Sequence, residues 1–403
     1  MADSVIIAPQ ILLPRKGIDL TKFAVTACDQ FTSQIDYWNS LETIIKDEPS
    51  SLRLIFPEAY LSLVNHDSYI NQINKNIDAY LKQGLLESQG SGFILVVRST
   101  PFQPKRLGLV IAIDLEQYSY DPQTRAPIRA SEATIVERIP PRLKIRENAS
   151  IEIPHVIVLF DDKARDIIEP LYEKRQQIPL VYDFDLNQNG GHLSGYFIKD
   201  TEPIIASFMK LLDRSSLLFV VGDGNHSLAT AKAHWNKIKL NLSIAEQQKH
   251  PARYSLVEAM NIYDEGLDFE PIHRFVNHTD KDFLPGLISN LTGPKTSYVY
   301  SKSDGKIPVY LPNNSPKSYK MVQAYIDGYL KTHPRAEVDY IHGEKDLIKI
   351  ATMHKDSYAI VMPSLTKEAV FAYLEQGVVL PRKAFSMGHA VEKRYYLESK
   401  LIK

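Results

Sequence analysis

The stretch Leu217–Trp235 constrains the fold of this chain more than any other. An apolar run, LLFVV, stops at Gly222-Asp223-Gly224, and apolar residues at helical spacing follow directly, at Leu228, Ala231, Trp235 and Ile238. This pattern predicts a buried strand, a tight turn and a helix. The glycines permit positive φ angles and a close approach by a ligand, and the helix directs unpaired N–H groups at the same place. The stretch therefore predicts a site that suits an anion.

The turn also carries much reactive chemistry. Asp223, Asn225, His226 and Ser227 bring a carboxylate, an amide, an imidazole and a hydroxyl within five residues. Ordinary turn chemistry is the alternative, because Asp-Gly and Gly-Asn pairs are common in turns and Asn225 or Ser227 can cap a helix. The strand before the turn and the helix after it favour a ligand site.

Composition limits the kinds of partner. The chain has 403 residues, a length that predicts two or three domains, and we expect them at residues 1–90, 91–292 and 317–403. Its 47 basic and 48 acidic residues leave a formal charge of -1, which argues against binding to nucleic acid or anionic membranes. The single cysteine, Cys28, excludes an intramolecular disulfide and a multi-thiolate metal site. Neither a basic leader nor a run of 18 apolar residues is present, so we expect a cytoplasmic protein.

Periodicity elsewhere indicates a mixture of strands and helices. It predicts a helix at Ser68–Leu86, a hairpin formed by Phe93–Val97 and Leu107–Asp114, a strand at Ile151–Phe160 that Pro154 interrupts, and a helix at Lys163–Lys174. Strand and helix patterns then alternate from residue 338 to residue 376, which favours a βαβα arrangement. The expected class is α/β to α+β. No GxxxxGK[ST] or GxGxxG sequence occurs, so neither a P-loop nor a typical dinucleotide fold is supported.

Residues 125–147 form the most basic segment, in which arginines alternate with acidic residues. A solvated surface laced with ion pairs is one interpretation. A phosphate clamp is the other, because guanidinium groups match phosphate oxygens; Arg142 and Arg146 would then bind phosphate while Glu132 acts as general base. His273 and Arg274, beside Pro271, have the same two interpretations.

Three further polar segments each have two interpretations. Asp161-Asp162 can hold Mg²⁺ or mark a helix N-terminus. Cys28, followed by Asp29 and Gln30, is a buried filler or a nucleophile. Gly190-Gly191-His192 shapes a hairpin or approaches a ligand.

Several segments together resemble a bacterial family, the domain-of-unknown-function family numbered 1015, over nearly the whole chain. They are ACDQFTSQIDYW, RASEATIVERIPPRLKIRE, LFDD, NGGHLSGY, GDGNHSLATAKAHW, PIHR and LPRKAFSMG. The resemblance implies a mixed sheet core of the ParB/sulfiredoxin-like type, with additional α/β elements at both ends of the chain. In that fold the central turn, similar to DGHHR, binds phosphate, and some members are kinases of free serine. It implies that Asp223, Gly224, Asn225 and His226 surround the phosphates of ATP or ADP. Ser227 departs from the family pattern, which has arginine there.

The leading hypothesis is an ATP-dependent phosphotransferase acting on a small hydroxylated metabolite. Glu132, Asp223 and His226 are the candidate catalytic residues, and Asp223 is the candidate Mg²⁺ ligand. The candidate nucleotide-binding residues are Gly222, Gly224, Asn225, Ser227, Arg142, Arg146, His273 and Arg274. One alternative is metal-assisted hydrolysis using His192, Asp223, His226 and His273. The other is a non-catalytic protein that senses a nucleotide or anionic metabolite. Homo-oligomerisation is compatible with each hypothesis.

Overall fold

The computed structural model describes residues 4–121, 123–132, 139–381 and 383–403. It divides into two compact units. Unit 1 contains residues 1–130, 134–267 and 389–403, and unit 2 contains residues 131–133 and 268–388. The chain thus leaves unit 1 after Leu267 and returns to it at His389.

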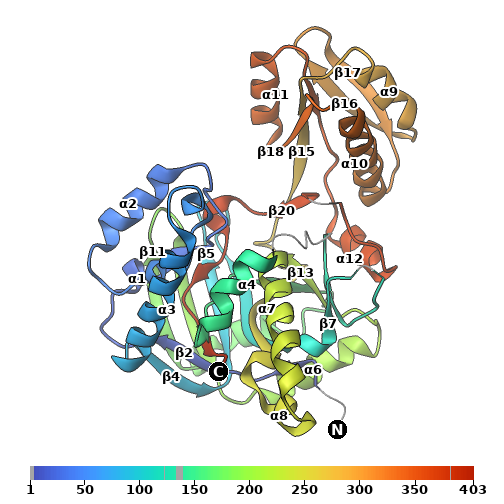
Figure 1. Ribbon diagram of the computed structural model, residues 1–403. Coiled ribbons are helices and arrows are strands. Elements are labelled where there is room, and N and C mark those ends of the chain that lie inside the picture. The colour runs from blue at the N-terminus through green and yellow to red at the C-terminus, as the bar shows by residue number, and fades with distance from the viewer. Residues whose placement is uncertain (1–3, 122, 133–138, 382) are drawn as a thin grey trace. The chain divides into compact units, whose positions relative to one another are not determined.

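A large mixed sheet forms the centre of unit 1 (Figure 1). In spatial order its strands are β11 (Leu180–Leu186), β12 (Gly191–Ile198), β5 (Phe93–Ser99), β6 (Arg106–Asp114), β14 (Tyr254–Asn261), β10 (Ile157–Phe160), β13 (Phe219–Asp223), β8 (Ile128–Ala130) and β7 (Tyr118–Ser119), with β1 (Ile6–Ile7) also paired to β6. Strand β10 runs parallel to β14 and antiparallel to β13, while β13 runs parallel to β8. All nine residues of β6 are buried, as expected of a central strand covered on both faces. The predicted α/β class, with a mixed sheet, is confirmed.

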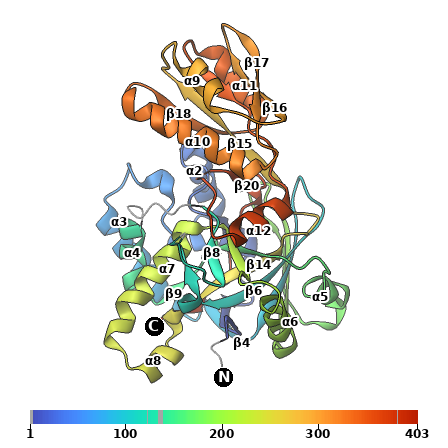
Figure 2. The same cartoon turned by 90° about the vertical axis from the view of Figure 1, so that its right-hand side faces the viewer.

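Helices cover both faces of this sheet. Figure 2 shows α3 (His66–Lys82), α4 (Ile139–Asn148) and α7 (Asn225–Ile238) on one side and α5 (Glu169–Glu173) and α6 (Glu202–Leu212) on the other. The remaining helices of unit 1 are α1 (Leu20–Phe23), α2 (Ile35–Ile45) and α8 (Ile244–Lys249). The core joins the layers: Phe208 of α6 packs against Phe160 and Phe219 of the sheet, and Trp235 of α7 is fully buried.

Three short strand pairs complete unit 1. They are β2 (Gln10–Pro14) with β4 (Leu86–Ser91), β3 (Val25–Thr26) with β21 (Tyr395–Tyr396), and β9 (Ile151–Glu152) with β22 (Lys400–Leu401). Two of the three pairs involve the last residues of the chain, which are therefore built into the unit.

Unit 2 has an antiparallel sheet of its own. Its strand order is β17 (Gly305–Leu311), β16 (Lys295–Ser301), β19 (Tyr358–Ile360), β15 (Phe269–Asn277) and β18 (Glu337–His342), and β20 (Phe385–Met387) also pairs with β15. The helices of unit 2 are α9 (Phe283–Asn290), α10 (Ser315–Thr332), α11 (Glu344–Met353) and α12 (Lys367–Glu375). Strands and helices alternate from β18 to α12 as predicted. However, β15 lies between β18 and β19 and is antiparallel to both, so these two strands are not neighbours.

Local predictions succeeded where the pattern was long. The β5–β6 hairpin and the β13–turn–α7 unit are confirmed. The strand predicted at Ile151–Phe160 with an interruption at Pro154 forms two separate strands, β9 and β10, with Pro154 between them. The helix predicted at Lys163–Lys174 is reduced to Glu169–Glu173, and the helix predicted to reach Leu86 ends at Lys82, since Leu86 begins β4.

Candidate functional site

The turn between β13 and α7 has the geometry of an anion site. Gly224 adopts a left-handed conformation, with φ of 81°, and precedes the first helical residue, Asn225. A Cβ at this position would lie 3.1 Å from Cα of Val156, so both the backbone angle and the space favour glycine. Gly224 is the N-cap residue of α7 and has no side chain with which to cap the helix. The first N–H groups of a helix have no partner within the helix, and they concentrate positive potential at this end.

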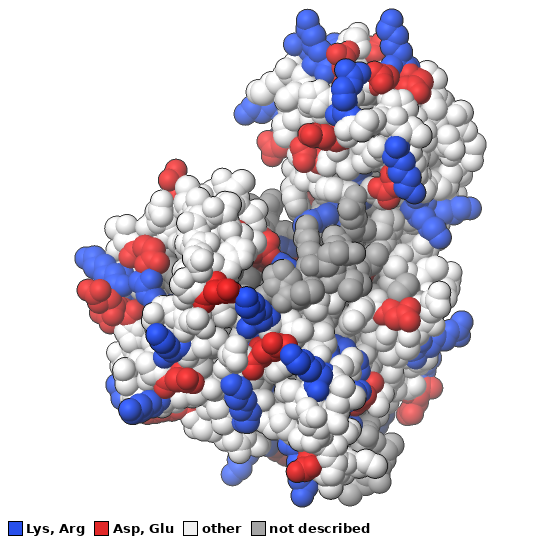
Figure 3. All heavy atoms as spheres, viewed as in Figure 1, with Lys and Arg blue, Asp and Glu red and all other residues white. Residues whose placement is uncertain are grey.

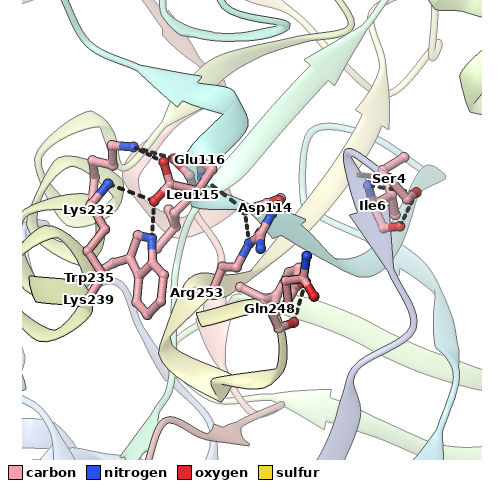
Figure 4. A network of polar contacts seen from close by, with 11 residues as sticks. Ser4, Ile6, Asp114, Leu115, Glu116, Lys232, Trp235, Lys239, Gln248 and Arg253 are labelled. Carbon is pink, nitrogen blue, oxygen red and sulfur yellow. Dashed lines mark hydrogen bonds and ion pairs between the residues drawn. The ribbon is translucent and has the colours of Figure 1, made fainter. Parts of the chain in front are cut away.

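Polar contacts hold α7 in place against the sheet (Figure 4). Trp235 Nε1 and Lys239 Nζ both donate to Glu116, and Lys232 Nζ donates to the carbonyl oxygen of Leu115 at 2.7 Å. These contacts come from the second half of α7 and from Lys239 directly after it, so they hold the C-terminal half of the helix in place. Beneath them, Arg253 forms a buried ion pair with Asp114, which ends β6.

A lysine from the end of the chain lies beside the turn. Lys393 Nζ is 3.3 Å from Oδ2 of Asp223, and the two side chains are only 8% and 17% exposed. The other oxygen of Asp223, Oδ1, accepts the N–H of Gly224 at 3.0 Å. Sequence reasoning missed Lys393, because nothing in the local pattern of residues 389–403 connects it with a turn 170 positions earlier.

A second polar group lies close to Gly224. His155 Cδ2 is 3.5 Å from the position that a Cβ of Gly224 would take. Nδ1 of this buried histidine is 2.8 Å from the hydroxyl of Tyr396, and its Nε2 is 3.8 Å from Oδ2 of Asp29. The Tyr396 hydroxyl also accepts the N–H of Cys28. Burial, followed by the nearby Asp29 carboxylate, raises the pKa of the Cys28 thiol to about 12, which does not favour a nucleophilic thiolate.

A cavity of about 500 Å³ in unit 1 reaches the first turns of α7. Ser227 and Thr230 of α7, His155, Tyr396 and Cys28 line it, together with residues of α3 and α4. Its size lies within the range of small-molecule sites.

The predicted arginines Arg142 and Arg146 also line this cavity, and the structure pairs each with a carboxylate. Arg142 binds Glu58, and Arg146 Nη2 is 2.6 Å from Oε2 of the buried Glu152. The structure thus brings both arginines to the same cavity as Ser227, as members of ion pairs.

The other members of the predicted turn lie where the sequence placed them. Gly222 is within β13, and His226 is the second residue of α7, with its carbonyl oxygen accepting the hydroxyl of Thr230 at 2.7 Å. Gly222, Asp223, Asn225, His226 and Ser227 are all partly exposed, so a ligand can reach them.

Three predicted site residues belong to unit 2. Glu132 accepts backbone N–H groups from Lys383 and Ala384, and burial raises its pKa against the opposing effect of these bonds. His273 Nδ1 accepts the N–H of Met362, and burial lowers its pKa. The fully buried Arg274 donates to Gln323 and to the carbonyl oxygens of Ile272 and Lys383. Each of these contacts stabilises the structure of unit 2. The catalytic role of Glu132 and the phosphate-binding roles of His273 and Arg274 stay predictions.

The residues of the metal hypothesis do not gather. His192 lies in the β11–β12 hairpin between Asp185, at 2.7 Å, and Asp183, at 2.9 Å. Asp162 is buried and accepts the N–H of Ile167 in a turn. Within the described parts of the chain, no three histidine, cysteine, aspartate or glutamate side chains are grouped so that they could hold a metal ion.

Surface charge is mixed. In Figure 3, Lys and Arg side chains are interspersed with Asp and Glu over the visible face. Among the described residues, no helix has both the length and the apolar character needed to cross a membrane.

The sequence matches the family described as "Protein of unknown function (DUF1015)" over residues 12–350. The chain belongs to this family. The match ends before Lys393 and Tyr396, so these two members of the site lie outside it. No curated protein matches the sequence.

Solved structures similar to this member of the DUF1015 family share little sequence with it. A conserved hypothetical protein from Pyrococcus furiosus is 11% identical, with a TM-score of 0.38, and the match covers 72% of this chain and 94% of that one. A free serine kinase in complex with AMP is 10% identical, with a TM-score of 0.40 and coverage of 72% and 90%. C-terminally truncated SbnI from Staphylococcus aureus is 10% identical, with a TM-score of 0.38 and coverage of 69% and 82%.

Proposed function

We propose that unit 1 binds the phosphates of ATP or ADP at the N-terminus of α7 and transfers a phosphoryl group to a small hydroxylated molecule. The observation that carries this proposal is the start of α7 after left-handed Gly224, which lies beside the Lys393–Asp223 pair and close to a cavity that Ser227 lines. Helix N-termini bind phosphate through their amides, and a buried lysine adds the compensating positive charge.

Each group has a role in this mechanism. The N–H groups of Asn225, His226 and Ser227 hold phosphate oxygens, and Lys393 neutralises their charge. Asp223 accepts the proton of the acceptor hydroxyl. The acceptor oxygen then forms a bond to the γ-phosphorus while the bond from that phosphorus to the bridging β–γ oxygen breaks, and ADP leaves. Arg142 and Arg146 contribute to phosphate binding only if they exchange their carboxylate partners for the ligand.

Magnesium accompanies ATP in most phosphoryl transfers, and Asp223 is the residue that fits it. Mg²⁺ in such sites is commonly bound by one or two carboxylates together with phosphate oxygens and water. The ammonium group of Lys393 lies 3.3 Å from Oδ2, which shows that this carboxylate interacts with positive charge. Bound Mg²⁺ would supply further charge neutralisation at the phosphates, and Asp223 would then hold it instead of accepting the hydroxyl proton.

We further propose that the mixed sheet of unit 1 is of the ParB/sulfiredoxin-like type. The position of the phosphate-binding turn supports this assignment, since the strand–turn–helix unit carries the motif through which the chain resembles that fold.

Calorimetry with ATP, ADP and AMP, with and without Mg²⁺, tests the proposal. We expect heat of binding in the intact protein and at least a tenfold loss of affinity in Lys393→Met, with Lys393→Arg intermediate. Lys210→Met, which removes an exposed lysine from α6, is the matched control and should bind normally. Absence of binding by every nucleotide would refute the proposal, and phosphate density at Gly224–Ser227 in a crystal soaked with ATP and Mg²⁺ would locate the site. Binding without turnover, unaffected by His226→Ala, would favour the regulatory alternative.

A further inference from the structure

The chemistry of the cavity restricts the molecule that it can hold. Aliphatic and aromatic residues supply about half of its lining, among them Leu54, Phe56, Ile70, Ile77, Ile145 and Ile151. Five of these six side chains are buried, and they come from the segment before α3, from α3 and from β9. Contact with such a surface stabilises an apolar ligand in proportion to the apolar area removed from water.

Charged groups in the lining compensate one another. Arg142 pairs with Glu58, Lys144 with Asp67, and Arg146 with Glu152. Among the described residues, each of the three Lys and Arg side chains that line the cavity therefore has a carboxylate partner. A charged ligand would have to break one of these ion pairs, whereas an uncharged ligand would leave all three intact.

Hydroxyl and imidazole groups lie at the end of the cavity nearest the turn. Ser227 and Thr230 line it from the first two turns of α7, and Tyr396 and His155 line it from the segments beside Gly224. A hydroxyl group placed there would find hydrogen-bond partners and would lie next to the start of α7. The cavity is thus lined by apolar side chains, by ion pairs and, beside the start of α7, by hydroxyl and imidazole groups.

We propose that this cavity is the acceptor site and that its ligand is an alcohol with an uncharged, largely apolar body whose hydroxyl group points toward Gly224 and Ser227. Phosphoryl transfer to that hydroxyl rests on the proposed function, but binding of the alcohol does not. The inference narrows the acceptor from any hydroxylated metabolite to one whose apolar part fills about 500 Å³ or less.

A series of straight-chain primary alcohols, from butanol to decanol, tests the inference by calorimetry without nucleotide. We expect the affinity to rise about fourfold for each added methylene until the cavity is full. The variant Ala149→Phe places a ring in the lining and should weaken decanol binding at least tenfold. Ile153→Thr is a smaller change to the same lining and should give a smaller loss in the same direction, even if Ala149→Phe fails to fold.

Leu240→Ala is the matched control, because Leu240 is 81% exposed and does not line the cavity. It should bind every alcohol normally. Affinity that does not depend on chain length, or that neither lining variant changes, would overturn the inference. Competition between decanol and ATP would overturn it too, because the cavity would then hold the nucleotide.

The two proposals fail separately. Alcohols that bind as expected to a protein without nucleotide affinity would leave the cavity assignment standing and refute the kinase proposal. Nucleotide binding that depends on Lys393, with no alcohol binding, would do the reverse. Loss of nucleotide affinity in Lys393→Met with unchanged decanol affinity is the outcome expected if both hold.

Discussion

Gly224 combines a backbone requirement with a spatial one, so its replacement is informative. In Gly224→Ala, a residue with a side chain must hold φ at 81° with its Cβ 3.1 Å from Val156 Cα. We expect the free energy of unfolding to fall by about 1–2 kcal/mol, and nucleotide affinity to fall with it. Urea denaturation and calorimetry measure the two effects. Gly328→Ala, in α10, where an added Cβ meets nothing, should instead be neutral or slightly stabilising.

His234 gives the folded protein a sensitivity to acid. Burial, followed by the charge of Arg146, lowers the pKa of this α7 residue to about 4. An unfolded histidine titrates near pH 6.5, so the folded protein keeps His234 neutral where the unfolded chain takes up a proton. Neutral His234 therefore makes its full contribution to the free energy of unfolding above about pH 6.5. This contribution, about 3 kcal/mol, is lost as the pH falls toward 4.

Urea denaturation between pH 4 and pH 8 measures this loss, with His234→Asn as the comparison. The variant should lose less stability than the parent protein as the pH falls, although it is less stable at pH 8 if its amide packs poorly. Identical slopes for the two proteins would show that His234 does not titrate as described.

At the level of single residues, the sequence predicts the turn but not its surroundings. Asp223, Gly224 and Ser227 follow from the local pattern, because a strand end, two glycines and a helix start leave a clear signal. Lys393 and His155 leave none, since they reach the turn through tertiary contacts. The pairing of Arg142 with Glu58 is equally invisible, because its partner is 84 positions away.

Among the elements, α7 depends on Glu116 for its position. In Glu116→Gln the helix loses a charged partner for Trp235 and Lys239, which we expect to lower the free energy of unfolding by about 1.5 kcal/mol at pH 7. Burial raises the pKa of Glu116, but its bonds from Lys239 and Trp235 outweigh burial and lower it. The stabilisation is thus present above the pKa of an unfolded glutamate, near 4.3, and disappears as the pH falls through the folded value.

Thermal denaturation at pH 7 and at pH 3.5 distinguishes this effect from a simple loss of packing. The difference between Glu116→Gln and the parent protein should shrink at the lower pH. Exposed Glu173, which lies in α5, provides the control, because Glu173→Gln should behave like the parent protein at both values. A difference that does not change with pH would contradict the electrostatic account.

Elements with strong local signals were predictable, and those set by distant partners were not. The β5–β6 hairpin and α7 have uninterrupted patterns and short connections. Between residues 151 and 160 the interruption at Pro154 is visible in the sequence, but the partners are not: β9 pairs with β22 at the end of the chain, and β10 pairs with β13 and β14. Periodicity measures which residues are buried, but it does not say which strand lies alongside.

For the whole molecule, residues 389–403 matter more than their length indicates. The sequence placed them with residues 317–388, while the contacts of the structure place them in unit 1. Arg394 is buried between Glu258 and Glu398, and Tyr396 pairs with Val25 in β3. Contacts that span more than 360 residues, such as that between Cys28 and Tyr396, leave no trace in any window of sequence.

Truncation after Gly388 should therefore disrupt unit 1 as a whole. It removes the only cation paired with buried Glu258 among the described ion pairs, and an uncompensated buried charge costs about 3–5 kcal/mol. It also exposes the surfaces that cover Tyr395, Leu397 and Ile402. Because domain stabilities are commonly about 5–15 kcal/mol, we expect residues 1–388 to lose the cooperative unfolding transition of unit 1 by circular dichroism and calorimetry. Arg394→Met in the full chain isolates the charge effect and should lower the midpoint without abolishing the transition. A truncated chain that unfolds at the parental midpoint would contradict this prediction. It would mean that unit 1 folds without residues 389–403 and that the contact of Lys393 with Asp223 does not contribute to its stability.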